Sequence, residues 1–252
     1  MKLANVRIVM VETSHPGNIG ACARAMKNMG LSQLYLVKPR LFPHDEATAR
    51  ASGAGDVLQQ ATICGSLDQA LEGCSVVIGA SARRRSIAWP ELNPRECAAL
   101  VAPHSQEANV AIVFGRESSG LSNEELDRCG YLVHIPCNEA FSSLNVAAAI
   151  QVVSYELRMY LEQGEAVEEA IESLDEPATS EELEGLYEHM QQALVDIDFL
   201  DADKPRKLMR RVRRLYNRAV LERREVNILR GILSAAQRQS KLAAEKQIII
   251  EK

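Results

Sequence analysis

The stretch VAIVFGRESSGL, residues 110–121, decides the fold class of this 252-residue chain. Its first five residues are apolar and rich in valine and isoleucine, as expected of a parallel strand that is buried on both faces. This strand runs directly into a loop of glycine, charged and hydroxyl-bearing residues. Four further apolar runs occupy residues 8–11, 34–37, 76–79 and 132–135, with helical patterns between them. The sequence therefore predicts an α/β domain with a mostly parallel sheet.

The helices between these strands begin and end at recognisable residues. The pattern over residues 19–29 ends at Gly30, and Asn18 can cap its start. Three further starts are predicted from capping boxes or apolar periodicity: Ser66 with Gln69, Ser122 with Glu125, and the pattern over residues 144–161.

Beyond residue 161 the charge distribution changes, although the net charge of the whole chain is only −5. Residues 162–203 contain 15 acidic and no basic side chains, whereas residues 204–230 carry 11 basic against two acidic ones, a net of +9. Such asymmetry indicates a nucleic acid or another anionic partner, with a solvated helical face as the alternative. We expect an α/β domain over residues 1–161, an acidic linker over 162–178 and a basic helical extension over 179–252.

The extension is expected to form three amphipathic helices. The first opens at Thr179 with Glu182, and its apolar face contains Leu183, Leu186, Tyr187, Met190 and Leu194. In the second, the apolar residues are Leu208, Val212, Leu215, Tyr216 and Ala219, and the opposite, basic arc contains Lys207, Arg210, Arg211, Arg213, Arg214 and Arg218. The third begins at Glu225 and presents Val226, Leu229, Ile232, Leu233 and Ala236.

Several functional classes are excluded by spacing. Gly115 and Gly120 are placed as in a phosphate-binding loop, but Leu121 stands where that loop needs a lysine. The GAG triplet at residues 53–55 lacks the third glycine of a dinucleotide site. The six cysteines and five histidines form no pair with metal-ligand spacing, so we expect no metal. No apolar run is long enough for a membrane span or a signal peptide, and we expect a cytoplasmic protein without a membrane partner.

Glycine and polar residues gather at three strand ends, where open α/β sheets bind their ligands. The segments are NIGACARA at residues 18–25, FGRESSGL at 114–121 and IPCNEAFSSLNVAAA at 135–149. In the first, Gly20 permits close backbone approach. In the third, simple capping of a helix by Ser142 or Ser143 is the alternative interpretation.

Together these segments resemble the three motifs of the SPOUT superfamily of RNA methyltransferases, in the form N-x-G-x-x-x-R, F-G-x-E-x-x-G-L and I-P-x(5)-S-S-L-N. The resemblance covers residues 6–157. The stretches VETSHPGNIGACARAMKNMGL and SARRRSIAWP are similar to the bacterial tRNA ribose 2′-O-methyltransferases that modify position 32 of the anticodon loop. This resemblance implies a deep trefoil knot, a homodimer built through the knot helices, a tRNA substrate and S-adenosylmethionine as the cofactor.

The resemblance also implies roles for individual residues. The expected cofactor contacts are Ala80, Ser81, Ala82, Gly115, Ile135, Ser142, Ser143 and Leu144. Arg24 is expected to hold a phosphate and to stabilise negative charge on the ribose oxygen, in its own subunit or in the partner's, because a guanidinium is a poor base. Asn18 is expected to orient the loop or the ribose, and Ser142 to contact the hydroxyl or the cofactor. Glu117 is expected to fix the second loop by accepting backbone hydrogen bonds.

RNA contact is expected from side chains beside the cofactor loops and from the basic extension. The predicted substrate-binding residues are Arg83, Arg84, Arg85, Arg116, Glu117, Asn145, Arg210, Arg211 and Arg214. Two alternatives stay open: a ribosomal RNA ribose 2′-O-methyltransferase of the same superfamily, and a non-catalytic RNA-binding protein with this fold.

Overall fold

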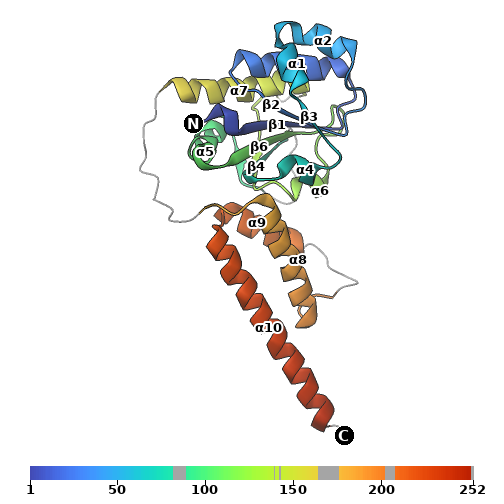
Figure 1. Ribbon diagram of the computed structural model, residues 1–252, viewed down its shortest axis with the longest axis vertical. Helices are drawn as coiled ribbons and strands as arrows, with labels where there is room; N and C mark the ends of the chain where they lie inside the picture. The colour runs from blue at the N-terminus through green and yellow to red at the C-terminus, as the bar shows by residue number, and fades with distance from the viewer. Residues whose placement is uncertain (82–88, 139, 142, 164–175, 202–207, 251–252) are drawn as a thin grey trace. The chain divides into compact units, whose positions relative to one another are not determined.

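Seven parallel strands form the centre of the N-terminal part of the chain in the computed structural model (Figure 1). Their order is β3-β2-β1-β6-β4-β7-β5, and every observed pairing is parallel. The structure describes residues 1–81, 89–138, 140–141, 143–163, 176–201 and 208–250. It divides into two units, Met1–Ser173 and Leu174–Lys252. The predicted α/β class is therefore confirmed, and the knot stays a prediction from the resemblance.

The central strands are those expected from the apolar runs: β1 Val6–Val11, β2 Gln33–Val37, β4 Cys74–Ala80, β6 Asn109–Phe114 and β7 Tyr131–Val133. Two short strands were not predicted, β3 Thr62–Cys64 and β5 Glu91–Leu92, which form the two edges of the sheet. Two or three residues at an edge, partly exposed, produce no apolar run to detect.

Helices cover both faces of the sheet. On one face α1 (Pro16–Asn28) packs against α2 (Asp45–Ala51) and α7 (Val146–Glu162), and α7 packs against α5 (Pro94–Glu107). The opposite face carries α4 (Leu67–Leu71) and α6 (Asn123–Leu126), as Figure 1 shows. The short helices η1 (Leu3–Asn5), η2 (Ser52–Ala54) and α3 (Gly55–Gln59) complete this unit.

The core on the α4 and α6 face forms because alternate strand residues point to opposite faces. Val9 and Val11 of β1, with Ala111 and Val113 of β6, belong to this apolar cluster. Trp89 also belongs to it, and its indole N–H donates to the carbonyl of Cys129 over 3.1 Å. Both faces of the central strands are thus buried, which explains their continuous apolar sequences.

At three of the predicted helix starts, the capping residues or capping contacts differ from those expected from the sequence. Helix α1 begins at Pro16, and its N-cap is His15, whose Nδ1 accepts from the backbone N–H of Gly17 over 3.1 Å. The prediction that Asn18 caps this helix is therefore wrong, because Asn18 lies in the first turn. Ser66 caps α4, but the Gln69 side chain accepts from Gly65 instead of completing the box. The N-cap of α7 is Asn145, so Ser143 does not cap it; Ser142 lies outside the described residues.

Other signals were read correctly. Ser122 and Glu125 form a complete capping box on α6, and Thr179 and Glu182 form one on α8. Gly30 ends α1 with a φ of +81°, a conformation that favours glycine.

The C-terminal unit contains α8 (Ser180–Asp196), α9 (Leu208–Ala219) and α10 (Arg223–Ile250). Its core includes Leu186 and Met190 of α8 and Val226 of α10, with Val212 and Tyr216 packed beside them. Two expected core residues are wrong, since Leu215 is 52% exposed and Ile232 is 59% exposed. No helix among the described residues is long and apolar enough to cross a lipid bilayer.

Candidate active site

A cavity of about 390 Å³ opens at the carboxyl ends of β4, β6 and β7. Six of the residues expected to contact a cofactor line it: Ala80, Ser81, Gly115, Ile135, Ser143 and Leu144. Ala82 and Ser142, which complete that expectation, lie outside the described residues. Strand ends meeting at one edge of a parallel sheet therefore bring the second and third sequence motifs to one cavity.

The second motif forms a closed loop over residues 115–121. Arg116 and Gly120 exchange backbone hydrogen bonds of 3.2 Å and 2.9 Å. A Cβ on Gly115 would lie 2.2 Å from the carbonyl carbon of Gly120, so a side chain there would prevent this closure. Gly120 has a φ of +70°. Gly115 and Gly120 are therefore required for the backbone of this loop to close. The resemblance had implied only that Gly115 contacts the cofactor.

The three motifs are joined by one hydrogen-bond chain. Nδ2 of Asn18 donates to Oε1 of Glu117 over 2.9 Å, and Nδ2 of Asn145 donates to Oδ1 of Asn18 over 3.0 Å. Asn145 in turn accepts from the backbone N–H of Ala147, which fixes the start of α7. A side chain from each motif therefore holds the next one in place beside the cavity, which both Glu117 and Asn145 line.

Glu117 also fixes the backbone that precedes α1. Its carboxylate accepts from the N–H and hydroxyl of Ser14 at 3.2 Å and 3.1 Å, and from the N–H of His15 at 3.4 Å. Burial raises the pKa of Glu117, but the hydrogen bonds from Asn18, from its own backbone and from Ser14 outweigh this and lower the pKa overall. We expected Glu117 to fix the second loop; its partners show that it also holds the first.

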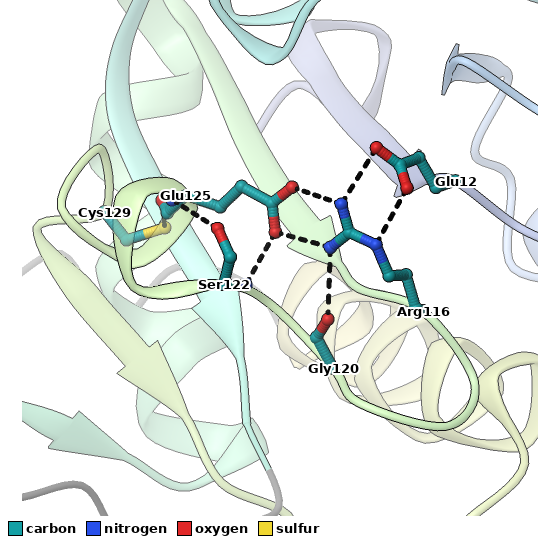
Figure 2. A network of polar contacts seen from close by, with 6 residues as sticks. All are labelled: Glu12, Arg116, Gly120, Ser122, Glu125 and Cys129. Atoms are coloured by element: carbon teal, nitrogen blue, oxygen red, sulfur yellow. Dashed lines mark hydrogen bonds and ion pairs between the residues drawn. The ribbon is translucent and has the colours of Figure 1, made fainter.

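Arg116 forms a second connection, between two carboxylates (Figure 2). Its guanidinium contacts Glu12, directly after β1, and Glu125 on α6. These hydrogen bonds raise the pKa of Arg116, and the one to Glu125 contributes more than the one to Glu12. The expected contact of Arg116 with RNA stays a prediction. In the structure, its guanidinium instead pairs with two carboxylates of the same chain.

Arg24 lies on the exposed face of α1. Among the described residues, none forms a hydrogen bond or an ion pair with it, and it is not one of those lining the cavity. Gly20, in the same helix, permits the backbone of α2 to approach α1: a Cβ there would lie 2.1 Å from the carbonyl oxygen of Ala47. The close approach expected at Gly20 is thus made by a helix of the chain.

The structure describes only some of the residues expected to bind RNA. Arg83, Arg84 and Arg85 lie outside the described residues. Arg211 is exposed on α9 and Arg210 and Arg214 are half-buried there. Arg213, placed on the same basic arc, instead faces α8: it pairs with Glu184 and its guanidinium lies 4.6 Å from the ring centre of Tyr187.

Several residues around the cavity were missed in the sequence. They are Phe114, Ser118, Ser119, Val133, Cys137, Val146 and Ala149. All but Val133 lie within the segments 114–121 and 135–149 that the sequence singles out, so their signal is membership of these segments. The structure shows no cluster of metal-ligating side chains among the residues that it describes. Burial raises the pKa values of Cys97 and Cys129 to about 12, as expected of unreactive core thiols.

The residues present fit the S-adenosylmethionine that the resemblance implies. Phe114, Leu121 and Val146 give the cavity an apolar wall suited to the faces of a purine, and Ser81 and Ser143 add hydroxyl groups. The loop glycine, Gly115, lines the cavity beside this wall. The volume falls within the range of roughly 300–1,000 Å³ typical of small-molecule sites.

Comparisons with known proteins agree with this arrangement. The family description "SpoU rRNA Methylase family" matches residues 5–155, and "tRNA methyltransferase TrmJ, C-terminal domain" matches residues 181–246. The tRNA (cytidine/uridine/adenosine-2′-O-)-methyltransferase TrmJ of Pseudomonas aeruginosa is 56% identical over 245 residues, covering 94% of this chain and 95% of that protein. The tRNA (cytidine/uridine-2′-O-)-methyltransferase TrmJ of Photorhabdus laumondii is 48% identical, covering 95% and 99%.

Solved structures give the same result for the fold. The crystal structure of TrmJ from Z. mobilis has a TM-score of 0.78 and 33% identity, covering 91% of this chain and 97% of that one. A probable methylase family protein from Haemophilus influenzae has a TM-score of 0.62 and 43% identity, covering 96% and 100%.

Proposed function

Because the chain belongs to the SpoU methylase family and is a tRNA ribose 2′-O-methyltransferase, we propose that it methylates the ribose of nucleotide 32 in the anticodon loop, using S-adenosylmethionine. The observation that carries this proposal is the chain of hydrogen bonds from Asn145 through Asn18 to Glu117, which assembles all three motifs beside one cavity. Position 32 rests on the resemblance of residues 11–31 and 81–90. The names of the relatives give a ribose 2′-oxygen of cytidine or uridine as the target, and in one case also of adenosine.

The cofactor is assigned to the cavity at the strand ends. Gly115, Ile135 and Leu144 would hold it mainly through backbone groups, with Ser81 and Ser143 beside them. When bound, S-adenosylmethionine would supply a methyl group on a positively charged sulfur: the ribose oxygen would gain the methyl carbon, the carbon–sulfur bond would break to leave a neutral thioether, and the hydroxyl proton would pass to solvent water. Ala80, at the end of β4, lines the same cavity.

Arg24 is assigned to the ribose and its phosphate. A guanidinium stays protonated, so this side chain stabilises negative charge on the ribose oxygen instead of accepting the proton. Arg24 is exposed and is not among the described residues that line the cavity, which supports a site completed by a second subunit. The proposal therefore includes a homodimer in which Arg24 acts in the partner's active site. Asn18, held between Glu117 and Asn145, orients the loop that precedes this helix.

The test is mapping of the methylated nucleotide. Full-length protein is incubated with S-adenosylmethionine and unmodified tRNA transcripts, and the products are mapped by nuclease digestion and mass spectrometry. We expect ribose methylation at nucleotide 32 only, retained in the presence of a chelator, since no step requires a metal. A substitution of the ribose by 2′-deoxyribose at position 32 is the matched substrate control and should abolish transfer. Methylation at another position, or transfer to ribosomal RNA alone, would contradict the proposal.

A further inference from the structure

The guanidinium of Arg116 is fully occupied by groups of its own chain (Figure 2). Nε donates to Glu12 over 2.9 Å, and Nη2 lies 2.9 Å from the other oxygen of the same carboxylate. Nη1 and Nη2 each donate to one oxygen of Glu125, and each of these hydrogen bonds is 3.0 Å long. Nη1 also reaches the carbonyl of Gly120 at 3.5 Å. Each N–H direction of the planar fork therefore meets an acceptor, which leaves it poorly suited to an RNA phosphate.

The two carboxylates connect parts of the fold that surround the second loop. Glu12 directly follows β1, and its φ of 47° is unusual for a residue with a side chain. Glu125 belongs to α6 and accepts as well from the backbone N–H of Ser122 over 2.7 Å. Arg116 thus ties the end of β1 and the start of α6 to the loop over residues 115–121.

Two of these three side chains, those of Arg116 and Glu125, are largely withdrawn from solvent, whereas Glu12 is exposed. The Arg116 side chain is 25% exposed, Glu125 is 14% exposed and Glu12 is 44% exposed. The charges of Arg116 and Glu125 are costly to leave unpaired, so this pair favours the backbone arrangement in which they meet. The exposed Glu12 adds a weaker, solvent-screened contact. The same loop lines the cavity from Gly115 to Leu121 and carries Glu117, which holds the first motif.

We infer that Arg116 is a positioning residue that sets the second loop for cofactor binding, and not a residue that contacts RNA. This inference rests on the proposed function, because the loop is one wall of the cavity assigned to S-adenosylmethionine. Lysine cannot replace it, since a single ammonium group lacks the planar fork that joins two carboxylates bidentately.

The test separates cofactor affinity from RNA affinity in the full-length protein. S-adenosylmethionine binding is measured by calorimetry for Arg116→Gln, Arg116→Lys and Glu125→Gln, and tRNA binding is measured across a salt series. We expect each variant to weaken cofactor binding by about tenfold, equivalent to about 1.4 kcal/mol. Both Arg116 variants should keep tRNA affinity within about twofold and leave the salt dependence unchanged, since Arg116 neutralises no phosphate in this scheme.

Arg7→Gln is the matched control for a loss of stability alone. Arg7 lies near the opposite end of β1, where it donates to the carbonyl of Ala70 over 3.1 Å and stacks on Tyr35. Its loss should lower the melting temperature without changing cofactor affinity. Glu125→Gln is a second control, because it keeps the Arg116 side chain and removes the negative charge of one of its two carboxylate partners.

Two results would overturn the inference. The first is unchanged cofactor affinity in Arg116→Gln, which would leave the proposed function intact. The second is a fall in the slope of log affinity for tRNA against log salt by about 0.7–0.9 in that variant, as for one lost phosphate contact. Failure of the unaltered protein to bind S-adenosylmethionine would be distinct, because it would overturn the proposed function and the inference together.

Discussion

Asn18 donates a hydrogen bond to Glu117 across 2.9 Å, although the two residues are 99 positions apart in the sequence. The amide oxygen of Asn18 is engaged at the same time by Asn145. An amide suits this position because it donates to a carboxylate and accepts from a second amide. A residue that resembles a simple helix cap is therefore the junction of the three motifs.

The charge of Glu117 should make the stability of this junction depend on pH. The pKa of Glu117 is lowered below its ordinary value of 4.5, so the folded chain binds its proton less readily than the unfolded chain. The stabilisation is therefore present above pH 4.5 and is lost as the pH falls through the lower, folded-state pKa. We expect Glu117→Gln to lower the free energy of unfolding at pH 7 and to have a smaller effect toward pH 3.

Denaturant unfolding at the two pH values measures this difference. Exposed Glu72, in the same unit, provides the control, and Glu72→Gln should change stability little at either pH. An equal loss of stability for Glu117→Gln at pH 7 and pH 3 would show that the charge of the carboxylate does not matter.

Gly20 should be irreplaceable for a reason of packing. Gly20→Ala would place a methyl group 2.1 Å from the carbonyl oxygen of Ala47, which is backbone and fully buried. We expect a loss of about 3 kcal/mol, at the upper end for overpacking. At Gly55 a Cβ would meet nothing within 4 Å and the backbone is helical, so Gly55→Ala should instead stabilise by about 0.5–1 kcal/mol. Unfolding curves of the two variants compare these effects; equal stabilities would contradict the close helix contact.

The sequence was informative where burial dictates a continuous pattern. The strands that contain Ile8, Val113 and Leu132 were found because both faces of the sheet are covered. The short edge strands carry no such pattern, and His15 was missed as a cap because histidine is rarely read as one.

Charge was harder to interpret than apolarity. Arg116 was expected to contact RNA and Arg213 was placed on the basic arc of its helix. In the structure Arg116 joins two carboxylates and Arg213 stacks on Tyr187. A basic residue in a sequence does not reveal whether an acidic partner lies far along the chain. The pairs Arg116 with Glu12 and Arg213 with Glu184 are separated by 104 and 29 positions.

Arg24 should be needed for catalysis and dispensable for folding. Its side chain is exposed and has no partner among the described residues, so Arg24→Ala removes no stabilising contact that the structure shows. We expect an unchanged melting temperature and cofactor affinity, with turnover reduced by about a hundredfold, the order for losing a positioned electrostatic group. Single-turnover assays with saturating tRNA measure the effect. Mixed dimers of Arg24→Ala subunits with cofactor-site variants test action across subunits; unchanged turnover in Arg24→Ala would remove the residue from the active site.

The basic helix α9 should divide into residues for RNA and a residue for stability. Arg211 and Arg214 have no hydrogen-bond or ion-pair partner among the described residues, and each substitution by glutamine should reduce the salt dependence of tRNA binding by about 0.7–0.9. Arg213 pairs with Glu184 and lies against Tyr187, and its side chain is only 16% exposed. Arg213→Gln should therefore lower the stability of the C-terminal unit by about 2 kcal/mol, the scale of a hydrogen bond between charged groups.

Each of the three substitutions by glutamine, at Arg211, Arg213 and Arg214, removes one positive charge from α9, so the variants serve as controls for one another. Salt titrations of tRNA binding and thermal unfolding of the full-length protein give the two readouts. We expect Arg211→Gln and Arg214→Gln to change the RNA slope at constant melting temperature, and Arg213→Gln to lower the melting temperature. If Arg211→Gln and Arg214→Gln left both the affinity and the slope unchanged, α9 would face another partner, and RNA recognition would lie in the α/β unit.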